Sequence, residues 1–241
     1  MPAWLSTACV HPEKILPKTG EYISMDEIPV PTFMAAEQNP WDDDYQRRGR
    51  LWGGSVPSLP RMPRSARILE LGCGDGKSIS SLVKDGYTVT AVDISSHAAA
   101  LCRDTCRDPD QARILIADVQ KTPFCNGSFD VVNASHVTGH LSLDGRRQLA
   151  GEVIRLLAPG GALYFRDFSV EDFRFGRGEQ TEDGTFMRKN GIMTHYFTED
   201  EVRALFFRLT VTSLVHHRWE MRVRGAVFPR VEIVAEFSRP A

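Results

Sequence analysis

The stretch "ILELGCGDGKS", residues 68–78, decides the fold because it joins a short apolar run to a glycine-rich turn. It is not a nucleotide-triphosphate loop, since that motif would place a glycine at position 71, where the chain has Leu71. Nor is it the G-x-G-x-x-G turn of dinucleotide-binding proteins, because its glycines are Gly72, Gly74 and Gly76. An apolar run, a glycine turn and a helical pattern predict a strand–turn–helix unit.

The same alternation continues beyond this turn. Strands are predicted at 66–71, 88–94, 112–118, 128–135 and 162–167, and helices at 76–85, 96–108 (begun by Ser95 or Ser96), 144–158 and 198–207. Strands that alternate with helices predict right-handed crossovers and a parallel sheet with helices on both faces. Two further strands, 209–221 and 230–237, are predicted to pair antiparallel, because the link 222–229 is too short for a crossover helix.

Composition restricts the possible partners. The chain has 241 residues, a formal net charge of -2 and 23 Arg against 6 Lys, so no overall charge draws it to nucleic acid or anionic membranes. No run of 18 apolar residues is present, and the first residues lack the basic start and apolar run of a secretory signal. The five cysteines form no C-x-x-C pair, which predicts reduced thiols and a cytoplasmic protein.

No complete metal site is predicted. Cys102 and Cys106 are four residues apart on an expected helix, as are His136 and His140 after the fourth strand, but neither pair has further ligands at a fixed spacing. Two alternatives stay open for the second pair: one of its histidines contacts substrate, or both have a purely structural role.

Polar residues follow the expected strands, where ligands bind in open parallel sheets. Asp93, with Ile94, comes 21 residues after Gly72 and is placed to accept hydrogen bonds from two ribose hydroxyls. Asp118 and Val119 follow the third strand, and are placed to meet an adenine. The fourth strand leads to Ser135 and His136, and the fifth to Arg166 and Asp167.

Glu70 separates two possible nucleotide cofactors. An acid two residues before the first glycine would repel a pyrophosphate, but it suits the cationic sulfonium or ammonium group of S-adenosylmethionine. Upstream, Trp41 and Tyr45 share one face of an expected helical turn and are predicted to close over that cofactor or to line the substrate entrance. The predicted cofactor-binding residues are therefore Trp41, Tyr45, Glu70, Gly72, Cys73, Gly74, Gly76, Asp93, Ile94, Asp118, Val119 and Ser135.

The chain resembles the class I S-adenosylmethionine-dependent methyltransferases. "ILELGCGDG", "VTAVDIS", "ILIADVQKTPFCNGSFDVV" and "RLLAPGGALYFRD" match the successive motifs of that superfamily over residues 68–167. The resemblance implies a Rossmann-like, seven-stranded, mostly parallel sheet with one antiparallel strand near the C-terminus. We expect an N-terminal arm that covers cofactor and substrate at 1–65, and a methyltransferase domain at 66–241 with a substrate insert at about 168–196.

The second half is similar to the methyltransferases that make 3-methylcytidine in tRNA. The similarity rests on "YFRDFSVEDFRFGRG", "GTFMRKNGIMTHYFTEDEVRALFF" and "PRVEIVAEF", together with Trp41-Asp42-Asp43-Asp44-Tyr45 upstream. It implies an acceptor at cytosine N3, with Asp167, Arg166 and His136 as catalytic residues. The insert would supply stacking aromatics (Phe168, Phe173, Phe175, Tyr196, Phe197) and phosphate-binding cations (Arg166, Arg174, Arg177, Arg188, Lys189).

Two other functions stay open. The segment "SHVTGHLS", residues 135–142, is more polar than expected in the tRNA family, and the first 40 residues match nothing there. One alternative is a small-molecule N-, O- or S-methyltransferase of the same fold, and the other is a non-catalytic cofactor-binding partner subunit. The sequence does not give the oligomeric state.

Overall fold

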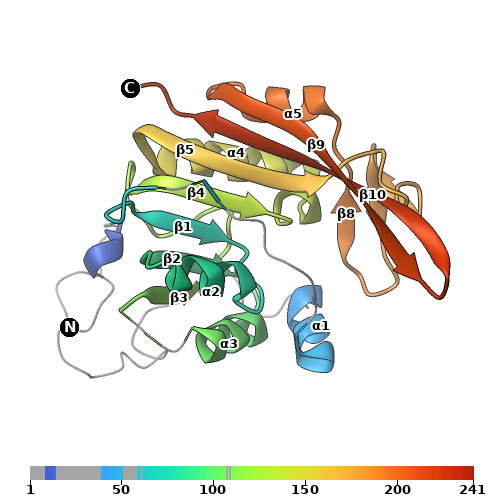
Figure 1. The fold of residues 1–241 in the computed structure, drawn as a ribbon, viewed down its shortest axis with the longest axis horizontal. Coiled ribbons are helices and arrows are strands. Elements are labelled where there is room, and N and C mark those ends of the chain that lie inside the picture. Colours follow the sequence, from blue (N-terminus) through green and yellow to red (C-terminus); the bar gives the residue numbers. More distant parts are fainter. Residues whose placement is uncertain (1–8, 15–38, 51–58, 61, 107, 109) are drawn as a thin grey trace.

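The computed structural model describes residues 9–14, 39–50, 59–60, 62–106, 108 and 110–241. Its main body alternates strands and helices (Figure 1). In chain order they are β1 (Ile68–Leu71), α2 (Lys77–Lys84), β2 (Val89–Asp93), α3 (Ser96–Thr105), β3 (Ala112–Ile116), β4 (Phe129–Ser135), the 3-10 turn η3 (Thr138–His140), α4 (Leu143–Leu156), β5 (Leu157–Phe168), α5 (Glu199–Leu205), β9 (Thr210–Val223) and β10 (Ala226–Ser238).

These strands form one seven-stranded sheet in the order β3-β2-β1-β4-β5-β10-β9. The first five are parallel, and β10 runs antiparallel to both of its neighbours. Side chains of α2 and α3 pack on one face, whereas those of α4 and α5 pack on the other. The predicted Rossmann-like sheet with one antiparallel strand and helices on both faces is thus confirmed.

Local sequence explains where the elements begin and end. Every residue of β1 and β2 is buried, as in parallel strands that are covered on both faces. Helix α3 begins after Ser95, whose side chain accepts a hydrogen bond from the Ala98 amide. Helix α5 begins with a capping box, in which Thr198 and Glu201 accept hydrogen bonds from each other's backbone amides.

The C-terminal hairpin is longer than predicted. Its strands continue to Val223 and from Ala226, so the expected link over 222–229 is wrong. Arg224 and Gly225 have φ values of 47° and 81°, the left-handed conformations of a two-residue turn that suits twisted strands. Pro229 has no N–H to donate to a neighbouring strand. It is tolerated inside β10 because the pairing with β5 begins only at Glu232, so this ladder requires no amide from residue 229.

The predicted insert folds as a small sheet of its own. Strands β6 (Glu179–Glu182), β7 (Thr185–Met187) and β8 (Met193–His195) pair antiparallel in that order. Figure 1 shows this sheet next to the hairpin, beyond the carboxyl end of β5. The upstream helix α1 (Pro40–Arg48) lies at the same edge of the main sheet, which we call the carboxyl edge.

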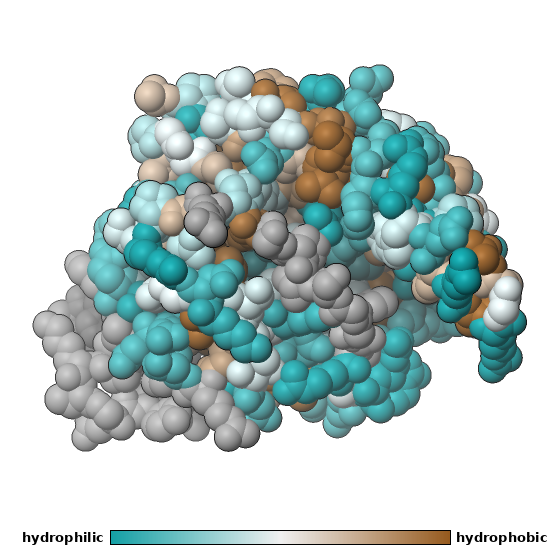
Figure 2. Space-filling view, viewed as in Figure 1, coloured by the Kyte–Doolittle hydropathy of each residue, from teal (hydrophilic) through white to brown (hydrophobic). Residues whose placement is uncertain are grey.

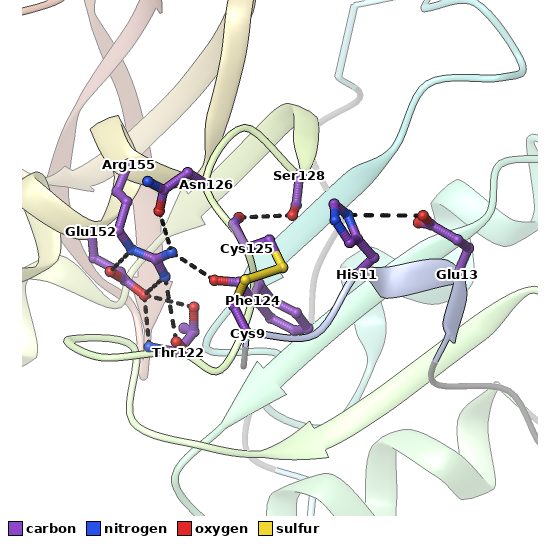
Figure 3. Close-up of a disulfide and its surroundings, with 10 residues drawn as sticks. All are labelled: Cys9, His11, Glu13, Thr122, Phe124, Cys125, Asn126, Ser128, Glu152 and Arg155. Carbon is purple, nitrogen blue, oxygen red and sulfur yellow. Dashed lines mark hydrogen bonds and ion pairs between the residues drawn. A yellow bond between two sulfur atoms is a disulfide. The ribbon is translucent and has the colours of Figure 1, made fainter. Parts of the chain in front are cut away.

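A disulfide joins Cys9 to Cys125 at the opposite, amino edge of the sheet (Figure 3). The prediction of five reduced thiols is therefore wrong for this pair, while Cys73, Cys102 and Cys106 are free and buried. Val10 pairs with Phe124 as a short parallel bridge, which brings the two cysteines together across 116 residues of sequence. The short turn η1 (Pro12–Lys14) follows.

The loop that carries Cys125 is fixed to α4. Glu152 accepts hydrogen bonds from the amide and hydroxyl of Thr122, at 2.7 and 2.6 Å. Arg155 donates to the Phe124 carbonyl at 2.6 Å and to Asn126 at 2.9 Å (Figure 3). The disulfide thus links the N-terminal segment to a rigid part of the domain.

Most of the predicted N-terminal arm, 1–65, lies outside the described residues, and its division from 66–241 stays a prediction. The helices that the structure describes are too short or too polar to cross a membrane.

Candidate functional site

The glycine-rich turn after β1 is held by the end of β2. The amides of Gly72 and Cys73 both donate to the Val92 carbonyl, at 2.9 and 3.0 Å. The amide of Gly74 donates to the Asp93 carboxylate at 2.8 Å. Gly74 has a φ of 52°, so the turn uses a left-handed conformation that favours glycine.

Asp93 links this turn to the next helix. Its other carboxylate oxygen accepts from the Ser95 amide at 2.9 Å, and burial raises its pKa against the effect of these bonds. Each oxygen has accepted one amide and keeps a second acceptor position, so two ribose hydroxyls can still donate to it. These residues fit the ribose of S-adenosylmethionine, whose binding at Asp93 stays a prediction.

Asp93→Ala is expected to weaken cofactor binding about 10- to 150-fold, because it removes charged hydrogen bonds worth about 1.5–3 kcal/mol. Titration calorimetry with S-adenosylmethionine measures the effect, and thermal unfolding confirms that the variant is folded. Asp85→Ala, an exposed acid at the end of α2, serves as the control. Unchanged affinity in Asp93→Ala would exclude the ribose assignment.

Helix α1 is attached to the end of β2 and the start of α3 by polar contacts. Asn39 caps α1 and donates its side-chain amide to the Ile94 carbonyl at 3.1 Å. Asp42 accepts from Ser95 at 2.7 Å and contacts the His97 ring nitrogen at 2.8 Å. Burial alone would raise the pKa of Asp42, but these hydrogen bonds outweigh it and lower the pKa to about 2. Asp42 therefore stays ionised at the positive end of α3.

Trp41 and Tyr45 lie on the inner face of α1, with ring centres 6.2 Å apart. A Cβ placed on Gly74 would come within 2.6 Å of the Tyr45 hydroxyl, so this ring lies directly over the turn. Trp41 packs edge-on against the ring of His140, with the two ring centres 4.7 Å apart. The two aromatics lie at the carboxyl edge, and the expectation that they close over the cofactor or line the substrate entrance stays a prediction.

Glu70 lies buried in β1 and accepts a hydrogen bond from Asn133 at 2.7 Å. Asn133 in turn accepts from the Ser135 hydroxyl at 3.0 Å. Burial raises the pKa of Glu70 to about 8 although the bond from Asn133 opposes it. This chain of hydrogen bonds connects the glycine-rich turn to the end of β4.

The remaining predicted cofactor residues lie around the same edge. Asp118 is half-buried and accepts from the amide of Gln120 at 2.9 Å. Val119 and Cys73 are buried, and Ile94 is half-buried. A cofactor contact at these positions stays a prediction.

The three predicted catalytic residues come together at the ends of β4 and β5. His136 Nε2 lies 3.0 Å from Glu232 and Nδ1 lies 3.8 Å from Asp167. Arg166 lies 3.5 Å from the other Glu232 oxygen. Sequence analysis missed Glu232, because only the antiparallel register of β10, which sets it opposite Phe168, brings it to this group.

Asp167 is fully buried and accepts from the amides of Gly139, at 2.7 Å, and Phe168, at 3.0 Å. Burial opposes its ionisation, but the neighbouring His136 lowers its pKa. His136 has a left-handed φ of 56° and stacks on Phe168 at 4.6 Å. Burial would lower the pKa of His136, yet Asp167 and Glu232 raise it to about 9. His136 is therefore a cation at neutral pH.

Several insert residues are placed differently from the predicted roles. Phe168, Tyr196 and Phe197 are buried, so they are not free to stack on a base, whereas Phe175 is 43% exposed. Arg174 pairs with Asp172 at 2.8 Å and covers the Phe168 ring at 3.8 Å, which removes it from the phosphate-binding set. Within the described residues, the insert cations without an ion pair are Arg177, Arg188 and Lys189.

Comparison with known proteins agrees with this arrangement. Residues 69–165 match the family model described as a methyltransferase domain. The chain is 29% identical over 202 residues to the tRNA N(3)-methylcytidine methyltransferase Mettl2 of Drosophila melanogaster, covering 77% of this chain and 62% of that protein. It is 32% identical over 132 residues to the 2-methyl-6-phytyl-1,4-hydroquinone methyltransferase of Synechocystis, covering 54% of this chain and 40% of that protein.

A SAM-dependent methyltransferase from Methanosarcina mazei has the same fold. Its crystal structure superposes with a TM-score of 0.63 and 24% identity, over 74% of this chain and 94% of that one. This likeness confirms the fold, and the domain match together with the similarity to Mettl2 confirms the resemblance inferred from the sequence. The chain spans less than two thirds of the curated relatives above.

Proposed function

Because the chain carries a class I S-adenosylmethionine-dependent methyltransferase domain and resembles the tRNA N3-cytidine methyltransferases, we propose that it methylates cytosine N3 in tRNA. The similarity to the Drosophila enzyme carries this proposal, because it covers 77% of this chain and so extends well beyond the matched domain at 69–165.

The site chemistry is compatible with this reaction. Bound S-adenosylmethionine supplies a methyl group on a positively charged sulfur. Cytosine N3 has a lone pair at neutral pH, so no residue has to act as a general base. The cationic His136 is unsuited to that role. What the protein must do is hold the unstacked base in line and exclude water. Trp41 and Tyr45 on α1 are placed for the second task.

Unpaired cations in the hairpin and the insert support an RNA substrate. The free end of the hairpin carries Arg222 and Arg224, both exposed and without an ion pair among the described residues. Figure 2 shows polar and apolar patches side by side there, and Val223 and Val227 are 43% and 48% exposed. Together with Arg177 and Arg188 in the insert, these side chains could follow a phosphate backbone.

The charge of the insert favours a second candidate, a small-molecule methyltransferase. Over 168–196 five acids outnumber four bases, which is unusual for a nucleic-acid surface. The acids are Glu171, Asp172, Glu179, Glu182 and Asp183, and the bases are Arg174, Arg177, Arg188 and Lys189. Methyl transfer from labelled cofactor into total tRNA, compared with a small-metabolite extract, decides between the two candidates. Label confined to metabolites would overturn the tRNA proposal.

Salt dependence gives a second, graded test. On single-stranded nucleic acid, each phosphate contact contributes about -0.7 to the slope of the log binding constant against the log salt concentration. Replacing four cations by Ala should therefore flatten the slope of tRNA binding by about three units and leave cofactor affinity unchanged. The four are Arg177, Arg188, Arg222 and Arg224.

A charge-matched variant controls for net charge. It replaces four arginines outside the proposed surface by Ala, namely Arg67, Arg103, Arg147 and Arg203. Their guanidinium groups already bind a carboxylate or a backbone carbonyl. An equal change of slope in both variants would mean that only overall charge matters, and that the named cations do not contact phosphates.

A further inference from the structure

His140, the last residue of η3, has a fixed tautomer. Its Nδ1 lies 2.6 Å from the Met193 carbonyl oxygen. A carbonyl can only accept a hydrogen bond, so Nδ1 carries the proton and Nε2 presents a lone pair when the ring is neutral. The proposed methyl transfer assigns no role to His140 Nε2.

The ring stays neutral over the working range of pH. Burial lowers the pKa of His140 to about 4, although the charge of Asp167 opposes the shift. Among the described residues nothing donates a hydrogen bond to Nε2, and this nitrogen is not one of the fully buried atoms without a partner. His140 Nε2 is thus a hydrogen-bond acceptor that a ligand can reach.

The position of His140 connects the two sides of the site. Trp41 of α1 packs against its ring at 4.7 Å, and Tyr45 beside Trp41 lies over Gly74. Its bond to Met193 attaches it to β8 of the insert. The ring therefore lies between the helix that covers the glycine-rich turn and the insert, where an acceptor base would enter.

His136, four residues earlier, cannot offer the same lone pair. Its Nε2 lies 3.0 Å from Glu232 and its buried Nδ1 lies 3.8 Å from Asp167. These carboxylates raise the pKa of His136 to about 9, so both nitrogens carry protons at neutral pH. Of the two histidines of this turn, His140 alone presents an acceptor nitrogen.

We propose that His140 Nε2 accepts a hydrogen bond from the exocyclic amine of the target cytosine and so distinguishes cytosine from uracil. This inference rests on the proposed tRNA function. Uracil presents a carbonyl oxygen where cytosine has its amine, so two acceptors would face each other in the site. A site built to hydrogen-bond one group rejects the analogue that lacks it, because its own polar atom is then left unpaired.

The test uses two RNA stem–loops that differ at the target nucleotide. One carries cytosine, and the other carries 2-pyrimidinone, which keeps the N3 lone pair and lacks the amine. For the native protein, kcat/KM is expected to be about 10- to 100-fold lower on 2-pyrimidinone, the loss of one hydrogen bond to a desolvated acceptor. His140→Phe keeps an aromatic ring against Trp41 and removes Nε2. It should lose about the same factor on cytosine but less than about threefold on 2-pyrimidinone, a comparison that cancels the lower intrinsic nucleophilicity of N3 in the base without the amine.

The outcomes are distinct. His140→Phe that loses activity but keeps the native discrimination has only a structural defect, and the inference is overturned. The same holds if the native protein methylates both RNAs equally. No transfer to the cytosine RNA, with cofactor bound, would instead overturn the proposed function. His11→Phe, at the amino edge, is the matched control and should leave both rates unchanged.

Discussion

Asp167→Asn is expected to lower the rate of methyl transfer about 100- to 1,000-fold, the loss seen when one preorganised polar group is removed from an active site. The native carboxylate accepts from the amides of both Gly139 and Phe168. Asparagine has one acceptor oxygen, so its NH₂ group would face one of these N–H donors without a partner. The change also removes the negative charge beside the cationic ring of His136.

Single-turnover rates with tRNA measure this effect, and calorimetry should show cofactor affinity within about threefold of the native value. The imidazole of His136, followed by NMR, provides a separate readout, because loss of the carboxylate must lower its raised pKa. Asp130→Asn, which breaks an exposed pair with Arg67, is the control. A normal rate together with a lowered His136 pKa would show that Asp167 sets the histidine charge without helping methyl transfer.

Cys9→Ser is expected to lower the free energy of unfolding by about 2–5 kcal/mol, because the native bond closes a long loop in the unfolded chain. The bond spans 116 residues, and its Cys125 end lies on a loop fixed by Glu152 and Arg155. Turnover at low temperature should change less than about twofold, since the disulfide lies at the edge opposite the site.

Denaturant unfolding with and without a thiol reductant measures this difference. Reductant should bring the native protein to the stability of Cys9→Ser and should leave the variant unchanged. If the oxidised native protein and the variant unfold at the same denaturant concentration, the bond adds no stability.

The sheet was predictable because its signals are local. Apolar runs, the glycine-rich turn and caps such as Ser95 lie within a few residues of the elements that they define. The three strands of the insert are only three or four residues long, so no period of alternation marks them. The hairpin strands were predicted too short, and only the three-dimensional register shows that the ladder with β5 needs no amide at Pro229.

The same distinction between local signals and long-range pairing holds for the candidate site. Asp93 and Asp167 lie at the carboxyl ends of their strands and His136 directly follows one, so their place at the carboxyl edge was predictable. Glu232 and Asn133 lie inside strands, and only the pairing of neighbouring strands gives them their partners. The disulfide was missed for a related reason, because the bridge between Val10 and Phe124 has no counterpart in sequence spacing.

Strand β9 has a consequence for handling the protein. It is the outer strand of the large sheet, and its backbone along that side has no neighbouring strand within the described residues. From Thr210 to Val215 it carries no charge, and Val215 is 54% exposed, while Arg218 and Glu220 lie further along. Uncharged outer strands attract other chains, whereas charged ones repel them. In concentrated samples, aggregation should therefore begin along Thr210–Val215, and a lysine introduced there would be the first change to make for crystallisation.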